Sequence, residues 1–587
     1  MKKVTIVVQD KDREEALTQL SALGLVHIDH LKEPAGQSIE RVEINISALE
    51  NATKSIPESS ETAEQVPVKN LPELIQEIDQ LAGDLIGLRA ERDKRNRLID
   101  EWKIWGDFDV KLLRELNGKG IWVYLVELPE KKLSDLPDDL AVQIFTRKGG
   151  VAYCGIISDN LKYFYFKTKT LPRKRLSEMI RDQEETGEKM KSLEEKLAGL
   201  SRFRSALEEE ADKLNRELEF EEARAGMEES GKLSYLQGYC PVTKTEKLEA
   251  AAKKNRWGLM LDDPEYEDLP PTLLTNPGWV RLIEPVFKLI DTVPGYREID
   301  ASFIFLVFFS LFFAMLIGDA GYGAVFLIGT GLAQWKLGGK LKDKKPIFLF
   351  YILSIATIIW GLLTGTIFGH EWLPQSVKPL TPWLDEPTNV MWLCFLIGAI
   401  QLTLAHLWKL IRKAPAIVAL ADLGWICIIW TMFFVAGMFI LDNPFPAFGI
   451  WLLAAGLVLI IGFSIPPRYF FKDLFVRMIT IFLSVINSFA DVVSYIRLFA
   501  VGLATVAIAD AFNNMAISSG WSSFPAGLIS AIILLFGHTL NMILGGMAIL
   551  VHGVRLNVLE FSSHLDMEWS GHKYNPFKGK KLSIEQE

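Results

Sequence analysis

Residues 301–559 form a succession of apolar segments separated by short polar loops. A helix needs about 20 mainly apolar residues to cross roughly 30 Å of hydrocarbon. By this measure the stretch predicts eight membrane-spanning helices, near residues 301–317, 319–335, 346–368, 390–408, 416–441, 446–465, 474–516 and 526–560. Residues 1–297 are rich in charge and contain no apolar run of that length. We therefore expect a soluble α+β domain over 1–297, an α-helical membrane domain over 298–566 and a tail over 567–587.

The loops of the membrane domain differ in charge. Basic residues follow the second, fourth, sixth and eighth segments: Lys336, Lys340, Lys342, Lys344, Lys345, Lys409, Arg412, Lys413, Arg468, Lys472, Lys573, Lys578, Lys580 and Lys581. The intervening loops contain only Lys378. Because loops rich in lysine and arginine stay in the cytoplasm, this asymmetry predicts a multi-pass protein of the cell membrane with both termini cytoplasmic.

Composition narrows the possible functions. A formal net charge of -9 argues against a nucleic-acid partner. The four cysteines, Cys154, Cys240, Cys394 and Cys427, lack the spacing of metal ligands, and nothing suggests a disulfide framework. The chain contains no Gly-x-x-x-x-Gly-Lys-Ser/Thr loop, since segment 238–245 lacks the second glycine. The chain is therefore not predicted to hydrolyse ATP itself, and no catalytic residue, metal site or cofactor is predicted.

One arginine lies deep in an apolar segment. Arg497 has more than fifteen residues of the run 474–515 on either side. An arginine at mid-bilayer costs about 3 kcal/mol on insertion scales, so it usually faces a partner or a watery cavity. A purely structural pairing is one explanation. The other, which we favour, is that Arg497 lies on an ion path, because the following segment carries matching polar groups.

The last two segments are also unusual in length. A helix of about 40 residues is roughly 60 Å long, so each must be tilted, broken or projecting from the bilayer. With about 100° per residue from His538, a polar or small-residue stripe follows. It consists of Asn541, Gly545, Ala548, His552 and Arg555. Tight helix packing through the small residues is the alternative explanation.

Counting along the two segments, taken as antiparallel and joined near residue 520, predicts where the arginines lie. Arg497 falls opposite about Asn541, and Arg555 falls several turns nearer the cytoplasm. Ser494 shares a face with Arg497, whereas Asp491 is about 120° away, so an Asp491–Arg497 pair is not expected.

Other polar residues of the membrane domain, most of them near the end of a predicted segment, are Asp319, Gln401, His406, Asp422, Asp510 and Glu560. For most of them, solvation at the membrane interface is the expected explanation. Asp319, between two glycine-rich segments, is a candidate for lining an ion entry.

The soluble domain combines strands with two long helices. Residues 3–30 predict strand, helix and strand, followed by a polar passage to about residue 68. Two heptad seams follow, at 74–88 and 190–218, and their pairing predicts an antiparallel coiled-coil hairpin. A small α/β lobe over 107–170 would lie at its tip, with strand-like runs at 121–128, 151–157 and 163–166. A second strand–helix–strand unit at 233–261 is expected beside the first.

Several motifs together resemble subunit a, also called subunit I, of V/A-type rotary ATPases, in the bacterial and archaeal branch. They are Pro270-Pro271-Thr272 with Asn276, Tyr296-Arg297-Glu298-Ile299-Asp300, Gly318-Asp319-Ala320-Gly321-Tyr322-Gly323, Ser494-Tyr495-Ile496-Arg497-Leu498 and His552-Gly553-Val554-Arg555-Leu556. The resemblance covers essentially the whole length. The chain departs from some eukaryotic members, which carry a histidine where Thr505 stands and a glutamate where Gly545 stands.

The resemblance implies a non-catalytic stator subunit that forms ion half-channels against a ring of proteolipid subunits. It would couple proton or sodium translocation to ATP hydrolysis or synthesis. Arg497 would face the ring, and Arg555 matches the family's second arginine. The resemblance implies that both arginines lie close to the ring carboxylate, whereas the count along the helices separates them. Half-channel candidates are Asp491, Ser494, His538, Asn541, His552, Glu560 and Asp319. Implied partners are the proteolipid ring, peripheral-stalk coiled-coil subunits, the base of the central stalk and membrane lipid.

Two other functions are consistent with parts of the sequence. A secondary transporter with a regulatory cytoplasmic domain would often show paired, interrupted helices in two repeats. No such pairing is found here, because the polar stripe is confined to the last two segments. A passive membrane anchor is disfavoured because it gains nothing from a buried arginine.

Overall fold

The computed structural model describes residues 1–57, 70–135, 141–158, 168–339, 341, 343–369, 372, 379–464, 470–520 and 523–578. The chain divides into two compact units. One contains Lys3–Asp262 and Pro576–Glu587, and the other contains Met1–Lys2 and Asp263–Asn575. The fold is mostly helical, with several apolar helices and a separate α+β N-terminal region, as the sequence predicts.

The two predicted strand–helix–strand units of the first unit build a single sheet. Its strand order is β2-β8-β1-β9, with β7 beside β8, and β1 pairs antiparallel with β9. Val4, Ile6 and Val8 alternate along β1 and are buried in its core, as expected of a strand with one covered face. The elements are β1 (Lys2–Gln9), α1 (Arg13–Leu23), β2 (His27–Asp29), β7 (Glu228–Ser230), β8 (Leu233–Cys240), α7 (Thr245–Asn255) and β9 (Gly258–Asp262).

The two heptad seams form long helices that pack in pairs. α3 (Leu71–Lys103) packs against α5 (Leu176–Gly199). Arg89 pairs with Glu194 at 2.9 Å, and Arg95 donates to Thr186 at 2.8 Å, so the two helices are antiparallel. A 3₁₀ turn, Leu200–Phe203, separates α5 from α6 (Arg204–Ala225). The second seam is therefore two helices rather than one.

A helix that the sequence interpretation missed covers α6. The passage expected to be polar contains α2 (Gln37–Ser55), which packs on α6. Its buried residues are Ile39, Val42, Ile46, Leu49 and Ala52. Their spacing of three and four residues is the helical signal that could have revealed it. The rest of that passage, residues 58–69, lies outside the described residues.

The lobe between α3 and α5 is a four-stranded antiparallel sheet of order β4-β5-β3-β6. Its elements are α4 (Val110–Gly118), β3 (Trp122–Pro129), β4 (Ala141–Lys148), β5 (Val151–Ser158) and β6 (Thr168–Lys169). The strands predicted at 121–128 and 151–157 are present, and β4 was missed. The strand predicted at 163–166 lies outside the described residues. The lobe therefore combines a helix with an antiparallel sheet.

The second unit contains the apolar helices. They are α9 (Ser302–Ile317), α10 (Ala320–Leu337), α11 (Lys345–Thr364), α12 (Pro387–Lys413), α13 (Ala419–Leu441), α14 (Phe448–Ser464), α15 (Phe470–Ser494), α16 (Ile496–Ser519) and α17 (Phe524–Ala548), followed by π-helical segments Ile549–Gly553 and Leu556–Phe561 and by α18 (Ser562–His564). Phe305, Phe312 and Leu316 of α9 are fully buried in the core of this unit.

Among the described residues, five helices are long and apolar enough to span a membrane, or six if a bent pair counts as one span. The bent pair is α9 and α10, and the bend between the two helices is 120°. Gly318 ends α9 with φ +68, a conformation that glycine adopts without strain. The protein is therefore multi-pass, while the number of eight spans stays a prediction.

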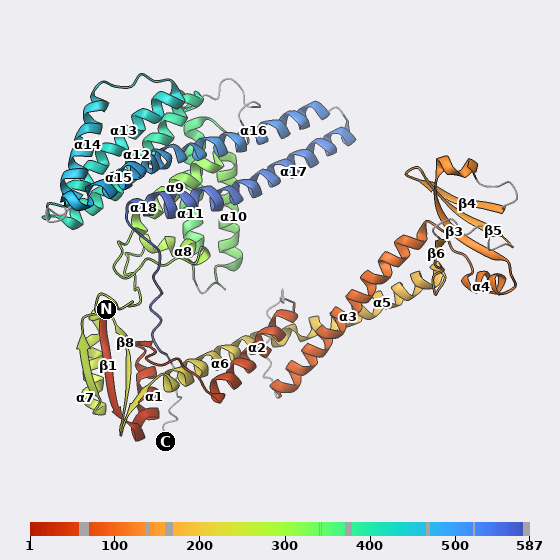
Figure 1. Ribbon diagram of the computed structural model, residues 1–587, viewed down its shortest axis with the longest axis horizontal. Coiled ribbons are helices and arrows are strands. Elements are labelled where there is room, and N and C mark those ends of the chain that lie inside the picture. The colour runs from red at the N-terminus through yellow and green to blue at the C-terminus, as the bar shows by residue number, and fades with distance from the viewer. Residues whose placement is uncertain are drawn as a thin grey trace. The chain divides into compact units, whose positions relative to one another are not determined.

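The two longest predicted segments are each irregular. The first has a one-residue break at Tyr495, between α15 and α16, within an otherwise continuous apolar helix over Met478–Ser519. The second passes from α17 through the two π-helical segments. α16 and α17 run side by side (Figure 1). Thr505 lies opposite Asn541 and Asn513 opposite His538, so the two helices are antiparallel.

Candidate functional site

The side chains of Arg497 and Arg555 meet at one carboxylate. Arg497, in the first turn of α16, forms an ion pair with Glu560 from the second π-helical segment. Arg555 Nε lies 3.6 Å from the same Glu560 oxygen. The side chain of Glu560 is 7% exposed, that of Arg497 21% and that of Arg555 57%. The two arginines thus share a buried counterion, and Arg555 is the more accessible.

The prediction that Arg497 lies opposite about Asn541 is wrong. Asn541 instead donates to the carbonyl of Thr505 at 2.7 Å, two turns further along α16. The count placed the turn between the two segments near residue 520, but Asn541 faces Thr505 and His538 faces Asn513, so the register of α16 and α17 is shifted by several residues. The count also assumed continuous α-helix to the end of the last segment. Each π turn accommodates an extra residue, so the phase and register of residues after 548 differ from that assumption.

The π segments also change the predicted stripe. Asn541 and Gly545 are buried, whereas His552 is half-buried and Arg555 is exposed. A Cβ at Gly545 would lie 2.8 Å from Ile317 Cδ1 of α9, so this glycine permits close helix packing. The part of the stripe before residue 548 therefore faces the protein, and the part after it turns away.

A chain of titratable side chains begins next to the break between α15 and α16. Asp491 Oδ2 lies 3.1 Å from His564 Nε2. His564 Nδ1 lies 2.9 Å from His406 Nε2, and His406 Nδ1 lies 3.3 Å from Asp422 Oδ1. We call Asp491, His564, His406 and Asp422 the histidine–carboxylate cluster.

Two lysines complete the far end of this cluster. Lys413 Nζ lies 2.8 Å from Asp422 Oδ2, and Lys409 Nζ lies 3.7 Å from Asp422 Oδ1. His406 and Asp422 are 4% and 2% exposed. The expectation that interfacial water solvates them is therefore wrong, because partners from distant parts of the sequence bury them. His564 was missed, since it lies beyond the predicted end of the last segment.

A second polar cluster lies on α10, α16 and α17. Tyr322 Oη lies 2.8 Å from His538 Nδ1, and His538 Nε2 lies 3.1 Å from Asn513 Oδ1. Asn541 donates to Tyr322 Oη at 2.9 Å. We call Tyr322, His538, Asn513 and Asn541 the amide–tyrosine cluster. Tyr322 and Asn513 were not singled out from the sequence, although Tyr322 belongs to the glycine-rich motif at 318–323.

Asp319 lies at the start of α10 and is only 1% exposed. One carboxylate oxygen accepts the backbone N–H groups of Gly321, Tyr322 and Phe368, and the other accepts that of Gly369. These contacts are those of a helix N-cap that also binds the chain after α11.

The break before Arg497 is held by a buried hydrogen-bond chain. Tyr495 donates to Gln401 Oε1 at 2.8 Å, and Gln401 donates to Asn557 Oδ1 at 2.9 Å. Tyr495, Gln401 and Asn557 are fully buried. A Cβ at Gly398 would lie 2.6 Å from the Tyr495 ring, so only a glycine leaves room there. These contacts fix the turn from which Arg497 extends.

Four half-channel candidates lie outside both clusters: Glu560 and Asp319, described above, and Ser494 and His552. Ser494 Oγ donates to the carbonyl of Asp491 at 2.8 Å, and His552 is half-buried in the first π-helical segment. Among the described residues, no group of three or more His, Cys, Asp or Glu side chains could hold a metal ion.

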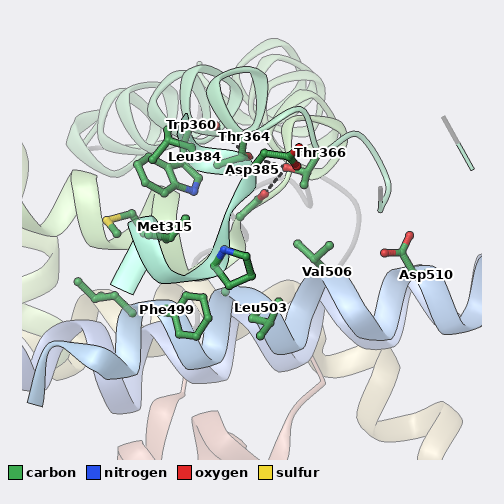
Figure 2. Close-up of a pocket in the computed structure, with 15 residues that line it drawn as sticks. Met315, Trp360, Thr364, Thr366, Leu384, Asp385, Phe499, Leu503, Val506 and Asp510 are labelled. Carbon is green, nitrogen blue, oxygen red and sulfur yellow. Dashed lines mark hydrogen bonds between the residues drawn. The ribbon is translucent and has the colours of Figure 1, made fainter. Parts of the chain in front are cut away.

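A cavity of about 350 Å³ lies along another face of α16 (Figure 2). Its lining is mainly apolar and includes Met315, Trp360, Phe499 and Val506, with Asp510 at one end. At about 100° per residue, Phe499 and Val506 lie on the side of α16 opposite Arg497. The cavity is therefore separate from the two arginines.

No protein-family model matches the chain. It is 33% identical to V-type ATP synthase subunit I of Borreliella burgdorferi, over 99% of each chain. The chain belongs to the V-type ATP synthase subunit I family. It is also 30% identical to V-type ATP synthase subunit I 1 of Treponema pallidum, over 98% of this chain and 99% of that one. A-type ATP synthase subunit I of Methanocaldococcus jannaschii is 27% identical, over 87% of this chain and 83% of that one.

Membership in the subunit I family confirms the resemblance predicted from the motifs. It makes the chain a stator subunit for ion translocation within a V/A-type ATP synthase. A secondary transporter is correspondingly not favoured.

Proposed function

We propose that this chain forms two ion half-channels against a proteolipid ring and that Arg497 separates them. It would couple proton or sodium translocation to ATP hydrolysis or synthesis in other subunits, without catalysing the ATP reaction itself. The observation that carries the proposal is the convergence of Arg497 and Arg555 on the buried Glu560, with a polar cluster on either side along α15 and α16.

Arginine suits the position between two half-channels. A ring carboxylate surrounded by hydrocarbon is most stable when neutral, carrying its proton or sodium ion. A fixed positive charge stabilises the ionised carboxylate, so the ion leaves near Arg497 and is replaced from the other side. Arginine keeps its charge in apolar surroundings and so does not donate its own proton to the path.

Glu560 then stands in for the ring carboxylate whenever none is near. It is an anion that both guanidinium groups contact, and its Oε2 is buried without a hydrogen-bond partner among the described residues. A passing ring carboxylate would exchange with Glu560 for Arg497. An exchange between two carboxylates costs less than exposing an unpaired buried charge.

The two clusters are the proposed half-channels. Asp491 lies six residues before Arg497 and begins the histidine–carboxylate cluster. Asn513 lies sixteen residues after Arg497, or about 24 Å along a helix, and belongs to the amide–tyrosine cluster. With the loop asymmetry, the first cluster would open to the cytoplasm and the second to the other side.

The soluble unit is the proposed stator arm. The paired helices α2 with α6 and α3 with α5 would form the coiled-coil hairpin, which peripheral-stalk and central-stalk subunits would bind. Residues 1–297 are proposed to lie in the cytoplasm, with residues 298–566 as the ion-translocating domain and the segment from 567 returning to the cytoplasm.

The eight-span topology makes a sharp test possible at α9 and α10. Single cysteines are introduced at Lys54, in α2, and at Lys336, in the last turn of α10, of a cysteine-free chain. Eight crossings place both on the same side, so an impermeant maleimide labels both from one side only. If α9 and α10 form one broken span, the two positions label from opposite sides.

The function is tested by purifying the complex through a tag on this chain and reconstituting it into vesicles. We expect ATP to drive ion uptake that is collapsed by an ionophore for the coupling ion. Ion or solute uptake that proceeds without ATP hydrolysis and without co-purified ring subunits would favour the secondary transporter instead.

A further inference from the structure

A second cavity, of about 440 Å³, lies in the unit Asp263–Asn575, away from both polar clusters. It lies beside α8 (Glu284–Leu289) and the 3₁₀ turn Val280–Ile283 that precedes it. Four basic side chains, Arg281, Lys288, Lys345 and Lys573, and two acidic ones, Glu284 and Asp291, line the cavity. Its lining therefore carries an excess of positive charge.

The surroundings of this cavity place it at the depth of lipid headgroups. Lys345 is the first residue of the membrane helix α11, and the 3₁₀ turn packs on α9 and α11. Trp279 contacts Phe303 edge-on at 5.4 Å, and the two are 55% and 46% exposed. Tryptophan is typical of the membrane–water boundary. Leu289 at the end of α8 is 68% exposed, which adds an apolar surface beside the charged cavity.

The basic groups of the cavity are not all neutralised within the chain. Glu284 accepts from Arg281 at 2.8 Å and also binds Lys345. Burial would raise the pKa of Glu284, but the hydrogen bonds from Lys345 and Arg281 lower it below its ordinary value, so Glu284 stays ionised. Lys288 Nζ lies 3.9 Å from Asp343 Oδ2, a long distance for an ion pair, and the Lys288 side chain is 61% exposed. Lys573 is also exposed. These two ammonium groups remain available to an external anion.

A hydroxyl group adds hydrogen-bonding capacity at the same place. Thr292 lines the cavity, and its Oγ1 is buried without a hydrogen-bond partner among the described residues. A hydroxyl can donate to a phosphate oxygen, and buried polar groups normally have such a partner. The apolar walls contributed by Leu273, Leu274 and Phe287 suit the first carbons of an acyl chain.

We propose that this cavity binds the phosphate of an anionic phospholipid headgroup, with Lys288 and Lys573 as its main charged contacts. Basic cavities between membrane helices recognise such headgroups, and each lysine near the surface contributes on the order of fivefold in affinity for anionic lipid. The bound lipid would join the loop before α9 to the strand-like segment around Lys573. That segment already bridges Thr272.

The test uses the purified complex, delipidated in a neutral detergent. Binding of three probes is measured by the shift in melting temperature: dihexanoyl phosphatidylglycerol, dihexanoyl phosphatidylcholine and inorganic phosphate. We expect the phosphatidylglycerol to bind best, because only it combines a net negative charge with acyl carbons. The double variant Lys288→Gln/Lys573→Gln should weaken its binding at least about tenfold.

Two controls keep the test sharp. Lys336→Gln removes an exposed basic residue of α10 that does not line the cavity, and it should leave the affinity unchanged. The double variant Lys288→Arg/Lys573→Arg retains both charges and should retain binding. It can be measured in place of the glutamine variant if that variant fails to assemble. Equal binding of phosphatidylglycerol and phosphatidylcholine, or an unchanged affinity in the glutamine variant, would overturn the proposal. Inorganic phosphate binding as well as the anionic lipid would identify a soluble phosphate site instead.

Discussion

The two polar clusters differ in the kind of group that they contain. In the histidine–carboxylate cluster, each of the three contacts joins two titratable side chains, and lysines neutralise one end. In the amide–tyrosine cluster, His538 lies between a phenol and an amide, and the nearby Asp319 is occupied by backbone N–H groups. The first cluster can gain and lose charge, whereas the second mainly offers neutral hydrogen bonds.

If the two clusters are the half-channels, as proposed, this difference implies two ways of conducting an ion. An imidazole has both a donor and an acceptor nitrogen when neutral, so two histidines in contact can pass a proton between two carboxylates. Amide groups do not exchange protons readily and instead orient water or a hydrated ion. We therefore expect the histidine–carboxylate cluster to be more sensitive to substitution and to pH.

The largest effect is expected at the residue between the clusters. Arg497→Ala should abolish ATP-driven ion uptake in reconstituted vesicles while the complex still assembles. Arg497→Lys should retain at most a small residual rate, because lysine loses its charge more readily in apolar surroundings. Substantial uptake by Arg497→Ala, normalised to assembled complex, would remove this arginine from the mechanism and leave the two clusters without a barrier between them.

The next largest effect should come from the histidine–carboxylate cluster. His406→Gln keeps a hydrogen-bonding side chain but removes the proton-passing ring, and uptake should fall at least about tenfold. The matched control is His552→Gln, a histidine of the same membrane unit outside both clusters, which should stay near the wild-type rate. Equal rates for the two variants would show that the contacts of His406 are structural.

The amide–tyrosine cluster should tolerate substitution better than the histidine–carboxylate cluster. His538→Gln loses about one hydrogen bond, so uptake should fall about fivefold, with little change in its pH profile. The comparison is made by measuring the rate against pH for His538→Gln and His406→Gln in parallel. A larger loss at His538 than at His406 would reverse the assignment of the titratable path.

The smallest effect is expected at Arg555. Its side chain is mostly exposed and lies 3.6 Å from the buried Glu560, so water screens the arginine's side of the pair, and we expect the pair to contribute at most about 1 kcal/mol. Arg555→Ala should therefore lower uptake about twofold, since water and lipid phosphate replace part of its charge. A rate as low as that of Arg497→Ala would mean that both arginines separate the clusters.

Periodicity and local motifs predicted the regular parts of the molecule. The paired strand–helix–strand units, the long helices of the unit that contains Lys3–Asp262 and the apolar helices all follow from local signals in the sequence. The helix α2 carried the same signal in Ile39, Val42 and Ile46, but the surrounding polar residues obscured it. The 120° bend between α9 and α10 depends on Gly318 and on packing, which hydropathy does not report.

The candidate site was harder to predict because its contacts are non-local. Arg497 was identified from its depth in an apolar run, Arg555 from the motif at 552–556, and Glu560 as a polar residue of the last segment. Their meeting depends on two π-helical segments, which leave no recognised mark in the sequence. His406 and His564 are 158 residues apart, and only the packing of α12 against α18 brings them together.

The path of the chain between its two units has a mechanical consequence. The chain passes from one unit to the other after Asp262 and passes back after Asn575. The last passage ends with Phe577 buried beside Phe220, its N–H bonded to the carbonyl of Val26 at 2.8 Å. A single connecting segment transmits tension but lets one unit rotate relative to the other, whereas two segments attached at different points resist that rotation. Under the proposed function the subunit must withstand torque from a turning ring, and the second connection lets covalent bonds carry part of it.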